Sequence, residues 1–275
     1  MPVISLLTDF GLTDPYAGIM KGVIFSVCPE ARIIDITHLI SPQDVHEAAY
    51  VLSASCAYFP KDTIHVAVVD PGVGSGRRIV AVKTEAGIFI APDNGLLSLV
   101  LEEQPLLFAF CVENPDIFIH PVSRTFHGRD IFAPAAARLA CGMEMDRLGP
   151  PLDADSLVRL DFGFPPEVNE KGVLRGSVII ADRFGNLVSN ILQSHIKEAF
   201  GEGISFGRHV CIRAGGRIIR GLSDSYACVP KGELLAIIGS SNRLEISVNG
   251  GNAEKQLRLG RKDRIEVYLC REPEK

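Results

Sequence analysis

Polar side chains that can do chemistry follow four apolar, strand-like segments of the sequence. Asp9 ends the first segment and His38 ends the second. Asp70 follows the third, and Asn94 follows the segment at 87–91. In an open parallel sheet, ligands bind beyond the carboxyl ends of the strands. One such ending has little weight because Asp and Asn also favour turns, but four together indicate a functional edge.

The loop after the third segment reads DPGVGSGRR, from Asp70 to Arg78. Its three glycines let the backbone approach a ligand or adopt a positive φ. The loop is not a Walker A motif, because no G-K-[ST] follows. It is not a dinucleotide-binding fingerprint either, because the glycine spacing differs and the next segment, RIVAVKT, reads as a strand. A phosphate cradle is therefore disfavoured.

The motif FHGRD places His127 at the start of a predicted helix. A single histidine is more often structural than catalytic, and both roles stay open at this position. Asp9, Asp70, His127 and Asp130 could together suggest a metal site. The sequence has no H-x-x-x-H or H-E-x-x-H spacing to support one. We therefore predict no metal and no cofactor.

The elements that would position these groups alternate between strand and helix in the first half of the chain. The strand candidates are short and almost continuously apolar, as strands buried on both faces are: 3–8, 32–37, 63–69, 79–84, 87–91 and 106–112. Helices are expected at 16–28, 41–57, 96–103 and 130–141, with Ser41 as the N-cap of the second. This alternation predicts an α/β domain at 1–155, with a mainly parallel sheet covered by helices.

The second half of the chain reads differently. A proline-rich stretch contains the expected linker at 156–170. Beyond it, only strand patterns separated by turn signals follow: 173–181, 186–191, 209–213, 217–222, 234–238, 243–247 and 264–270. They predict an all-β domain at 171–275, a small antiparallel barrel or sandwich, which we assign as a barrel.

Two features of this second half could recognise a ligand. The turn DRFGN, at 182–186, is either a backbone-driven turn or a recognition loop. In the second case, the Phe184 ring and the Asn186 amide match the stacking and edge contacts that a purine needs. Tyr226 could stack similarly.

Composition limits the possible partners. Hydrophobic residues make up 47% and charged residues 22%, as in soluble globular proteins, and the net charge of −5 argues against a nucleic-acid partner. Seven cysteines without a C-x-x-C spacing predict reduced thiols in a cytosolic protein rather than a disulfide framework. We expect a cytoplasmic location, because the N-terminus does not read as a signal peptide and no apolar run approaches about 18 residues.

Seven collinear motifs resemble one family, the S-adenosylmethionine hydroxide adenosyltransferases, which are relatives of the fluorinase and chlorinase: TDFG, PEARIIDITH, VVDPGVGSGRR, APDNGLL, TFHGRD, DRFGN and GSSNRLEISVNGGNA. The resemblance covers about residues 3–270. It implies an N-terminal α/β domain, a C-terminal β-barrel and a homotrimer with active sites between subunits. The implied reaction converts S-adenosyl-L-methionine and water to adenosine and L-methionine.

The resemblance also implies a catalytic triad of Asp70, Arg77 and His127 that positions water or hydroxide for attack at C5′. Arg78 is the second candidate for the arginine. The halogenases have uncharged groups at the Asp and His positions and bind halide there, so this chain falls on the hydrolytic side. Two alternatives are a halide-using adenosyltransferase that makes 5′-halo-adenosines, and a non-catalytic adenosine or S-adenosylmethionine sensor.

A set of substrate-binding residues is implied as well. Asp9 matches the carboxylate that binds the ribose hydroxyls, and Asn186 matches the amide at the adenine edge. The other implied residues are Phe184 and Tyr226 for stacking, Asp14 at the ribose or methionine, Asp182 and Ser241 near the methionine, and Ser240, Glu245 and Val248 in the last motif. One departure is Asn242-Arg243, where glycine followed by an aromatic or apolar residue is common.

Overall fold

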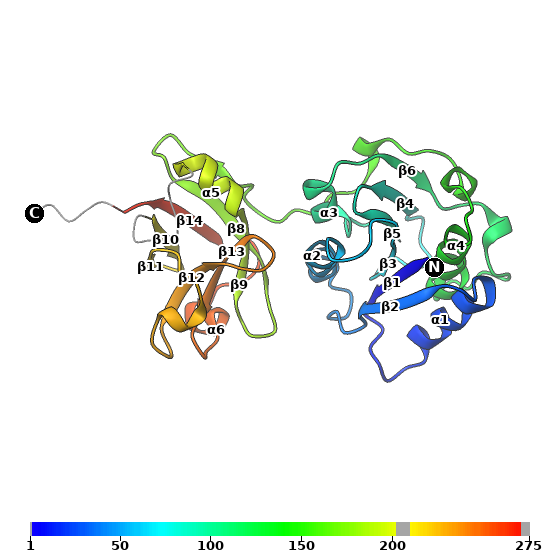
Figure 1. The fold of residues 1–275 in the computed structure, drawn as a ribbon, viewed down its shortest axis with the longest axis horizontal. Coiled ribbons are helices and arrows are strands. Elements are labelled where there is room, and N and C mark those ends of the chain that lie inside the picture. Colours follow the sequence, from blue (N-terminus) through cyan, green and yellow to red (C-terminus); the bar gives the residue numbers. More distant parts are fainter. Residues whose placement is uncertain (1, 202–209, 271–275) are drawn as a thin grey trace, which may run out of the picture. The chain divides into compact units, whose positions relative to one another are not determined.

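The structure is a computed structural model that describes residues 2–201 and 210–270 (Figure 1). The chain divides into two compact units, Met1–Leu160 and Asp161–Lys275. Each unit has its own hydrophobic core. The prediction of an α/β domain followed by a β-barrel domain is confirmed.

The first unit is built on a six-stranded sheet in the order β2-β1-β3-β5-β4-β6. Its strands are β1 (Val3–Thr8), β2 (Arg32–Thr37), β3 (Ile64–Val68), β4 (Ile79–Thr84), β5 (Gly87–Pro92) and β6 (Phe108–Cys111). The β1–β2, β1–β3 and β3–β5 pairs are parallel, whereas β4 is antiparallel to both β5 and β6. A tight hairpin between β4 and β5 reverses the direction of β4. The other five strands run in one direction, so the sheet is mainly parallel, as predicted.

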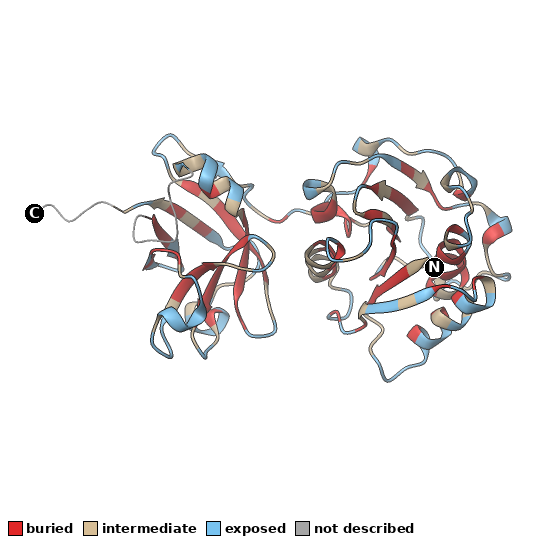
Figure 2. Cartoon of the chain, in the orientation of Figure 1, coloured by how far each residue is buried: buried red, intermediate tan, exposed pale blue. Residues whose placement is uncertain are grey.

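Helices cover both faces of this sheet. They are α1 (Tyr16–Val27), α2 (Val45–Cys56), α3 (Ser98–Glu103) and α4 (Ala133–Ala140). Residues of α1 and α4 share one apolar cluster, and residues of α2 and α3 share another. In β1, Leu6 belongs to the first cluster and Leu7 to the second, which explains the nearly continuous apolar sequence. The edge strand β2 is the exception, because all of its residues are half-buried or exposed (Figure 2).

Helix α2 begins later than the sequence indicated. Asp44, not Ser41, is its N-cap, and the Asp44 carboxylate accepts a hydrogen bond from the Glu47 N–H at 3.0 Å. Gln43 has a φ of 65°, which no helical residue adopts, so the helix cannot extend back through it. The predicted N-cap at Ser41 was therefore wrong.

The second unit is an antiparallel, nearly closed barrel. Its path is β11-β10-β14-β8-β9-β13-β12, with β7 beside β8. The strands are β7 (Glu167–Val168), β8 (Leu174–Ala181), β9 (Leu187–Leu192), β10 (Val210–Ala214), β11 (Arg217–Arg220), β12 (Leu234–Ile238), β13 (Arg243–Val248) and β14 (Arg264–Leu269). An isolated bridge between Ser223 and Ile237 joins the two ends of the path. Two short helices that the strand pattern did not predict, α5 (Gln193–Phe200) and α6 (Ala253–Leu257), interrupt the connections.

Two cysteines of the barrel form a disulfide. Cys211 on β10 is bonded to Cys270, which directly follows β14, with a Cα–Cα distance of 5.3 Å. The prediction of seven reduced thiols was wrong for this pair. The two residues are 59 positions apart, and only the antiparallel pairing of β10 with β14 brings them together. The remaining five cysteines are free.

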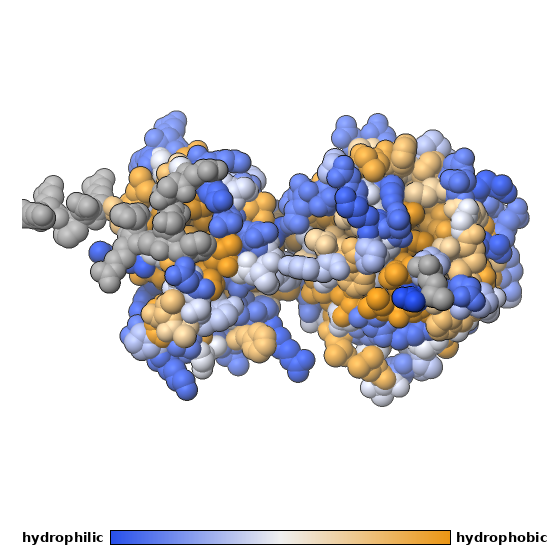
Figure 3. Space-filling model, in the orientation of Figure 1, coloured by the Kyte–Doolittle hydropathy of each residue, from blue (hydrophilic) through white to orange (hydrophobic). Residues whose placement is uncertain are grey.

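The surface drawn in Figure 3 intersperses hydrophilic and hydrophobic residues over both units, in keeping with the average composition. Within residues 2–201 and 210–270, every helix is too short or too polar to cross a membrane.

His65 on β3 is a fully buried histidine that makes stability depend on pH. Its Nδ1 lies 2.7 Å from the Ser5 hydroxyl oxygen, and its ring stacks on Phe89 at 4.8 Å. Burial lowers the pKa of His65 from 6.5 to about 4. Between these two values the unfolded chain binds a proton that the native protein does not, so the free energy of unfolding falls as the pH drops through this window.

We expect the His65→Gln variant to lose this acid sensitivity. A shift of this size corresponds to about 3 kcal/mol between pH 7 and pH 4. Urea unfolding at several pH values should show a steeper decline for the wild type than for the variant. Parallel declines would contradict this assignment.

Candidate active site

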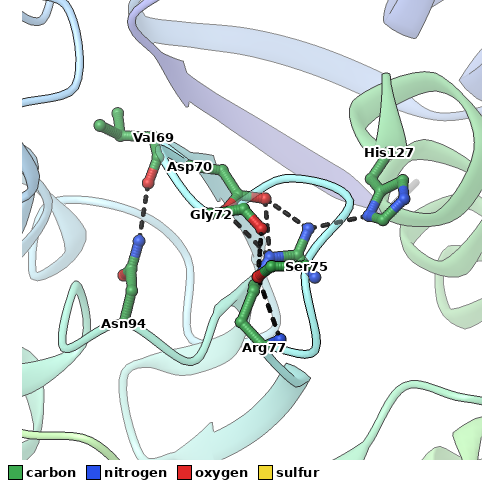
Figure 4. Close-up of polar contacts among 7 residues, drawn as sticks. All are labelled: Val69, Asp70, Gly72, Ser75, Arg77, Asn94 and His127. Atoms are coloured by element: carbon green, nitrogen blue, oxygen red, sulfur yellow. Dashed lines mark hydrogen bonds and ion pairs between the residues drawn. The ribbon is translucent and has the colours of Figure 1, made fainter. Parts of the chain in front are cut away.

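The centre of the site is an ion pair between Asp70 and Arg77. Asp70 lies just after the end of β3, and the Arg77 Nε–H group donates to both carboxylate oxygens at 2.9 Å (Figure 4). Arg77 Nη2 also donates to Oδ2 of Asp70. The Asp70 side chain is only 5% exposed and the Arg77 side chain only 11%. A charge-assisted, forked pair with so little solvent contact holds both groups in one orientation.

The glycine-rich loop folds back to make this pair. Gly74 has a φ of +76°, and a Cβ atom there would lie 2.3 Å from the Arg124 carbonyl oxygen. Ser75 donates its hydroxyl to the Gly72 carbonyl oxygen at 2.7 Å. The glycine at 74 is therefore required by a close backbone contact with the segment that leads to His127.

His127 completes a chain of contacts through Arg77. It precedes a π-helical turn, Gly128–Phe132, and its Nδ1 lies 2.8 Å from Arg77 Nη2 (Figure 4). Because the guanidinium donates, Nδ1 accepts, and the neutral imidazole carries its proton on Nε2. Burial, reinforced by the Arg77 charge, holds the pKa of His127 below its usual value of 6.5, although Asp70 and Asp130 oppose this shift.

Arg78, the second candidate for the arginine of the triad, points to other partners. Its Nε donates to Oδ2 of the buried Asp93 at 2.8 Å, and its Nη2 donates to the Ser156 carbonyl oxygen. Asp93 also accepts from the Val158 N–H at 2.9 Å. Arg78 thus fastens the segment around Ser156, and Arg77 is the arginine that contacts Asp70 and His127.

The end of β1 carries Asp9, whose Oδ2 accepts a hydrogen bond from the Gln43 N–H at 2.8 Å. Sequence reasoning missed Gln43, because it acts through its backbone and its side-chain type carries no signal. Its positive φ is an uncommon conformation for a residue other than glycine, and such residues often occur at functional sites.

His38, expected among the groups at the sheet edge, is buried instead. Its Nδ1 lies 2.8 Å from the Thr8 hydroxyl oxygen, and its Nε2 lies 3.1 Å from Oδ1 of Asp35. Thr8 in turn accepts from the Phe10 N–H at 3.2 Å. His38 therefore braces the turn that presents Asp9 rather than facing a ligand.

An aromatic cluster that the sequence analysis also missed connects this turn to His127. The rings of Phe10, Tyr16 and Phe126 lie 5.0–5.9 Å apart. Phe10 directly follows Asp9 and Phe126 directly precedes His127. These aromatic neighbours of two candidate residues were the sequence signal that could have revealed the cluster.

Asp14, another predicted binding residue, is exposed in the turn before α1.

Asp130, the fourth member of the possible metal cluster, belongs to another network. It is fully buried and accepts from the Ser123 N–H at 2.8 Å and from Arg129 Nε at 2.6 Å. In the part of the chain that the structure describes, no three His, Cys, Asp or Glu residues are grouped to hold a metal ion.

In the second unit, the DRFGN turn joins β8 to β9. Asp182 Oδ1 accepts from the Phe184 and Asn186 N–H groups at 2.9 and 2.8 Å, and its Oδ2 accepts from the Asn186 amide at 2.9 Å. The bare Gly185 backbone lies against Asn252, where a Cβ atom would come within 2.0 Å of the side chain. The turn is thus internally fixed, and it leaves the Phe184 ring 76% exposed.

Tyr226 and Glu245 lie close to this turn. The Tyr226 hydroxyl donates to Glu245 Oε2 at 3.4 Å. Burial, and next the charge of Asp182, raises the pKa of Glu245. Asp182, Asn186, Tyr226 and Glu245 therefore form one polar cluster at this end of the barrel.

The other predicted residues of the last motif differ in their surroundings. Val248 packs in the barrel core, and the buried Ser241 hydroxyl has no hydrogen-bond partner among the described residues. Ser240 lies in the same turn, between β12 and β13.

The unusual pair Asn242-Arg243 fits the local backbone. Asn242 has a φ of 58°, in the left-handed region that asparagine tolerates better than most residues, so it can replace glycine. Arg243 is only 2% exposed on β13, where an apolar residue would otherwise be expected.

Comparison with known proteins finds matches to both units of the chain. The model of the SAM hydroxide adenosyltransferase N-terminal domain matches residues 4–149, and that of the C-terminal domain matches residues 176–266. An (R)-S-adenosyl-L-methionine hydrolase from Thermus thermophilus is 36% identical over 98% of this chain and 100% of its own. A fluorinase from Actinoplanes sp. is 32% identical over 72% of this chain and 74% of its own.

The fold has a close match among solved structures. An uncharacterized conserved protein from Thermotoga maritima superposes with a TM-score of 0.86 at 38% identity, covering 98% of this chain and 100% of that one. Together with the two domain matches, this shows that the chain belongs to the SAM hydroxide adenosyltransferase family.

Proposed function

We propose that the protein hydrolyses S-adenosyl-L-methionine to adenosine and L-methionine. The observation that carries this proposal is the continuous contact from Asp70 through Arg77 to His127. Family membership supports it, and the hydrolase relatives are 33–37% identical to this chain whereas the fluorinase relatives are 28–32% identical. Three polar side chains connected in series through Arg77 suit the positioning of water better than the binding of a bare halide.

The chemistry needs little acid catalysis. As the water oxygen bonds to C5′, the C5′–S bond breaks and its electron pair returns to sulfur, which leaves as the neutral thioether of methionine. The oxygen that has just bonded to C5′ is a protonated alcohol and hence strongly acidic. A carboxylate suffices to take its proton, and we assign that role to Asp70. The main task of the site is to hold the water in line with the C5′–S bond.

His127 acts on Arg77 in this proposal. Its Nδ1 accepts a hydrogen bond from the guanidinium. The neutral imidazole thus fixes the orientation of the guanidinium, which stays protonated and holds the Asp70 carboxylate in place to accept the proton. Protonation of His127 would place two cations against each other and open the contact.

Substrate binding is assigned to both units of the fold. We propose that Asp9 accepts from the two ribose hydroxyls, and that Asn186, Phe184 and Tyr226 hold the adenine. The methionine end is assigned to Asp182 and Ser241, and contributions from Asp14, Ser240, Glu245 and Val248 complete the set. We further propose a homotrimer in which the first unit of one subunit and the second unit of its neighbour share each site.

Replacing Asp9 by Asn should raise KM for S-adenosylmethionine by about 10- to 100-fold and change kcat by no more than a few-fold. An amide can still accept the Gln43 N–H, but it provides one acceptor oxygen instead of two and removes the charge from bonds to the ribose hydroxyls. Steady-state kinetics measure the effect, with Asp62→Asn, an exposed carboxylate before β3, as the matched control. An unchanged KM would remove Asp9 from the ribose site.

Product analysis tests the proposed function against its alternatives. Purified protein with S-adenosylmethionine should yield adenosine and methionine in equal amounts. Formation of 5′-chloroadenosine in chloride buffer would instead indicate the halide-using reaction. Tight binding without turnover would indicate a sensor.

A further inference from the structure

We propose that Asn94 is a positioning residue that sets the orientation of Asp70. This inference rests on the proposed role of Asp70 in hydrolysis. The Asn94 side chain donates from Nδ2 to the Val69 carbonyl oxygen at 2.9 Å (Figure 4). Its Oδ1 accepts from the Leu96 N–H at 3.2 Å, just before α3. One amide therefore connects the peptide group in front of Asp70 to the start of a helix.

The Val69 carbonyl needs this partner. Strand β3 ends at Val68, and its registered pairs with β1 and β5 end at Val68 and Val66, respectively. Val69 itself is fully buried in the apolar cluster beneath α2 and α3. A buried carbonyl without a donor is strongly disfavoured, so loss of the Asn94 amide would rotate the peptide to find another.

Rotation of this peptide would displace the Asp70 carboxylate, which contacts the reacting water in the proposed mechanism. The Val69–Asp70 peptide carries the Cα of Asp70, and the Asp70 carboxylate moves Arg77 with it through their forked pair. His127 is held separately, on the turn before α4. A displacement of about 1 Å near the reacting centre can lower a rate by about 100-fold. The change should therefore appear in kcat, because Asn94 acts on the position of Asp70 rather than on substrate affinity.

The chain contains a matched control for this test. Asn114 makes the same two bonds in the same unit: its Nδ2 donates to the Arg147 carbonyl oxygen at 2.8 Å, and its Oδ1 accepts from the Asp116 N–H at 3.0 Å. None of these partners belongs to the proposed triad. Asn94→Ala and Asn114→Ala thus remove bonds of the same geometry, one part-buried next to Asp70 and one exposed elsewhere.

The experiment measures kcat, KM and thermal stability of the full-length variants from pH 5 to pH 8.5. We expect Asn94→Ala to lower kcat about 30- to 100-fold with KM within about threefold of the wild type. Asn114→Ala, whose bonds are more exposed, should lower the melting temperature less and keep kcat within about twofold. Equal kcat values for the two variants would overturn the proposal, and a large rise in KM for Asn94→Ala would reassign Asn94 to substrate binding.

The Asn94→Asp variant provides a signature that a general loss of stability cannot produce. An ionised carboxylate can accept from Leu96 but cannot donate to Val69, whereas a protonated one can donate its O–H. The ratio of its kcat to that of the wild type should rise as the pH falls, while the ratio for Asn94→Ala stays flat. A flat ratio for both variants would count against the positioning role.

Asp70→Ala in the same assay distinguishes a failure of the proposed function from a failure of the role of Asn94. If Asp70→Ala keeps wild-type turnover, the proposed function of Asp70 fails. If Asp70→Ala is inactive and Asn94→Ala is fully active, only the role of Asn94 fails.

Discussion

Replacing Arg77 by Lys should lower kcat for S-adenosylmethionine hydrolysis by about 100- to 1000-fold with the fold intact. Arg77 holds Asp70 through Nε and Nη2 and simultaneously contacts His127 through Nη2. An ammonium is a point charge on a flexible stem and cannot keep this planar fork, so the variant retains the charge but loses the geometry. Losses of this size follow removal of one preorganised electrostatic contact from an active site.

The neighbouring residue is the matched control. Arg78 donates from Nε and Nη2 to Oδ2 of Asp93 but contacts neither Asp70 nor His127. Arg78→Lys should keep kcat within about threefold of the wild type, although it weakens the attachment of the segment around Ser156. Circular dichroism checks that both variants are folded. If both variants lost turnover equally, the contact chain through Arg77 would not be the catalytic feature.

The second large effect is expected at His127. His127→Ala should lower kcat about 100-fold or more, because the guanidinium loses the acceptor that fixes it. In His127→Asn, the side-chain oxygen lies near the former Nδ1 position and can still accept from Arg77. This variant should retain at least ten times the activity of His127→Ala. Equal loss in both variants would indicate that the imidazole itself takes the proton.

The pH dependence follows from the same contact. Since burial and the Arg77 charge lower the pKa of His127 below 6.5, the imidazole is neutral at pH 7. Turnover should therefore fall only below pH 6.5, as the imidazole gains a proton and repels Arg77. The asparagine variant has no group that titrates there and should lack this acid limb. Retention of the limb in His127→Asn would assign it to another group.

The layers of the fold and the neighbourhood of the triad could be predicted from the sequence for a physical reason. Strands such as β1 and β3 are buried on both faces, so their sequences are mostly apolar, and Asp9 and Asp70 follow their ends. Parallel pairing then places these ends at one edge. The choice of Arg77 over Arg78 required coordinates, because adjacent arginines on a loop can point to different partners.

Contacts made by the backbone or across long sequence separations could not be predicted. Gln43 reaches Asp9 through its N–H, and Asn94 reaches the carbonyl of Val69, so neither partner depends on a side-chain type that the sequence displays. The disulfide between Cys211 and Cys270 depends on the pairing of two distant strands. His38 appeared to be an edge group, but its imidazole is buried between Thr8 and Asp35.

The most direct test of the central claim is hydrolysis in water enriched in ¹⁸O, with mass spectrometry of both products. Attack of water at C5′ predicts one ¹⁸O atom in the 5′-hydroxyl of adenosine and none in methionine. Label should accumulate at the rate of turnover and be lost with Asp70→Asn. Adenosine without label, or products cleaved at another bond to sulfur, would contradict the proposed reaction.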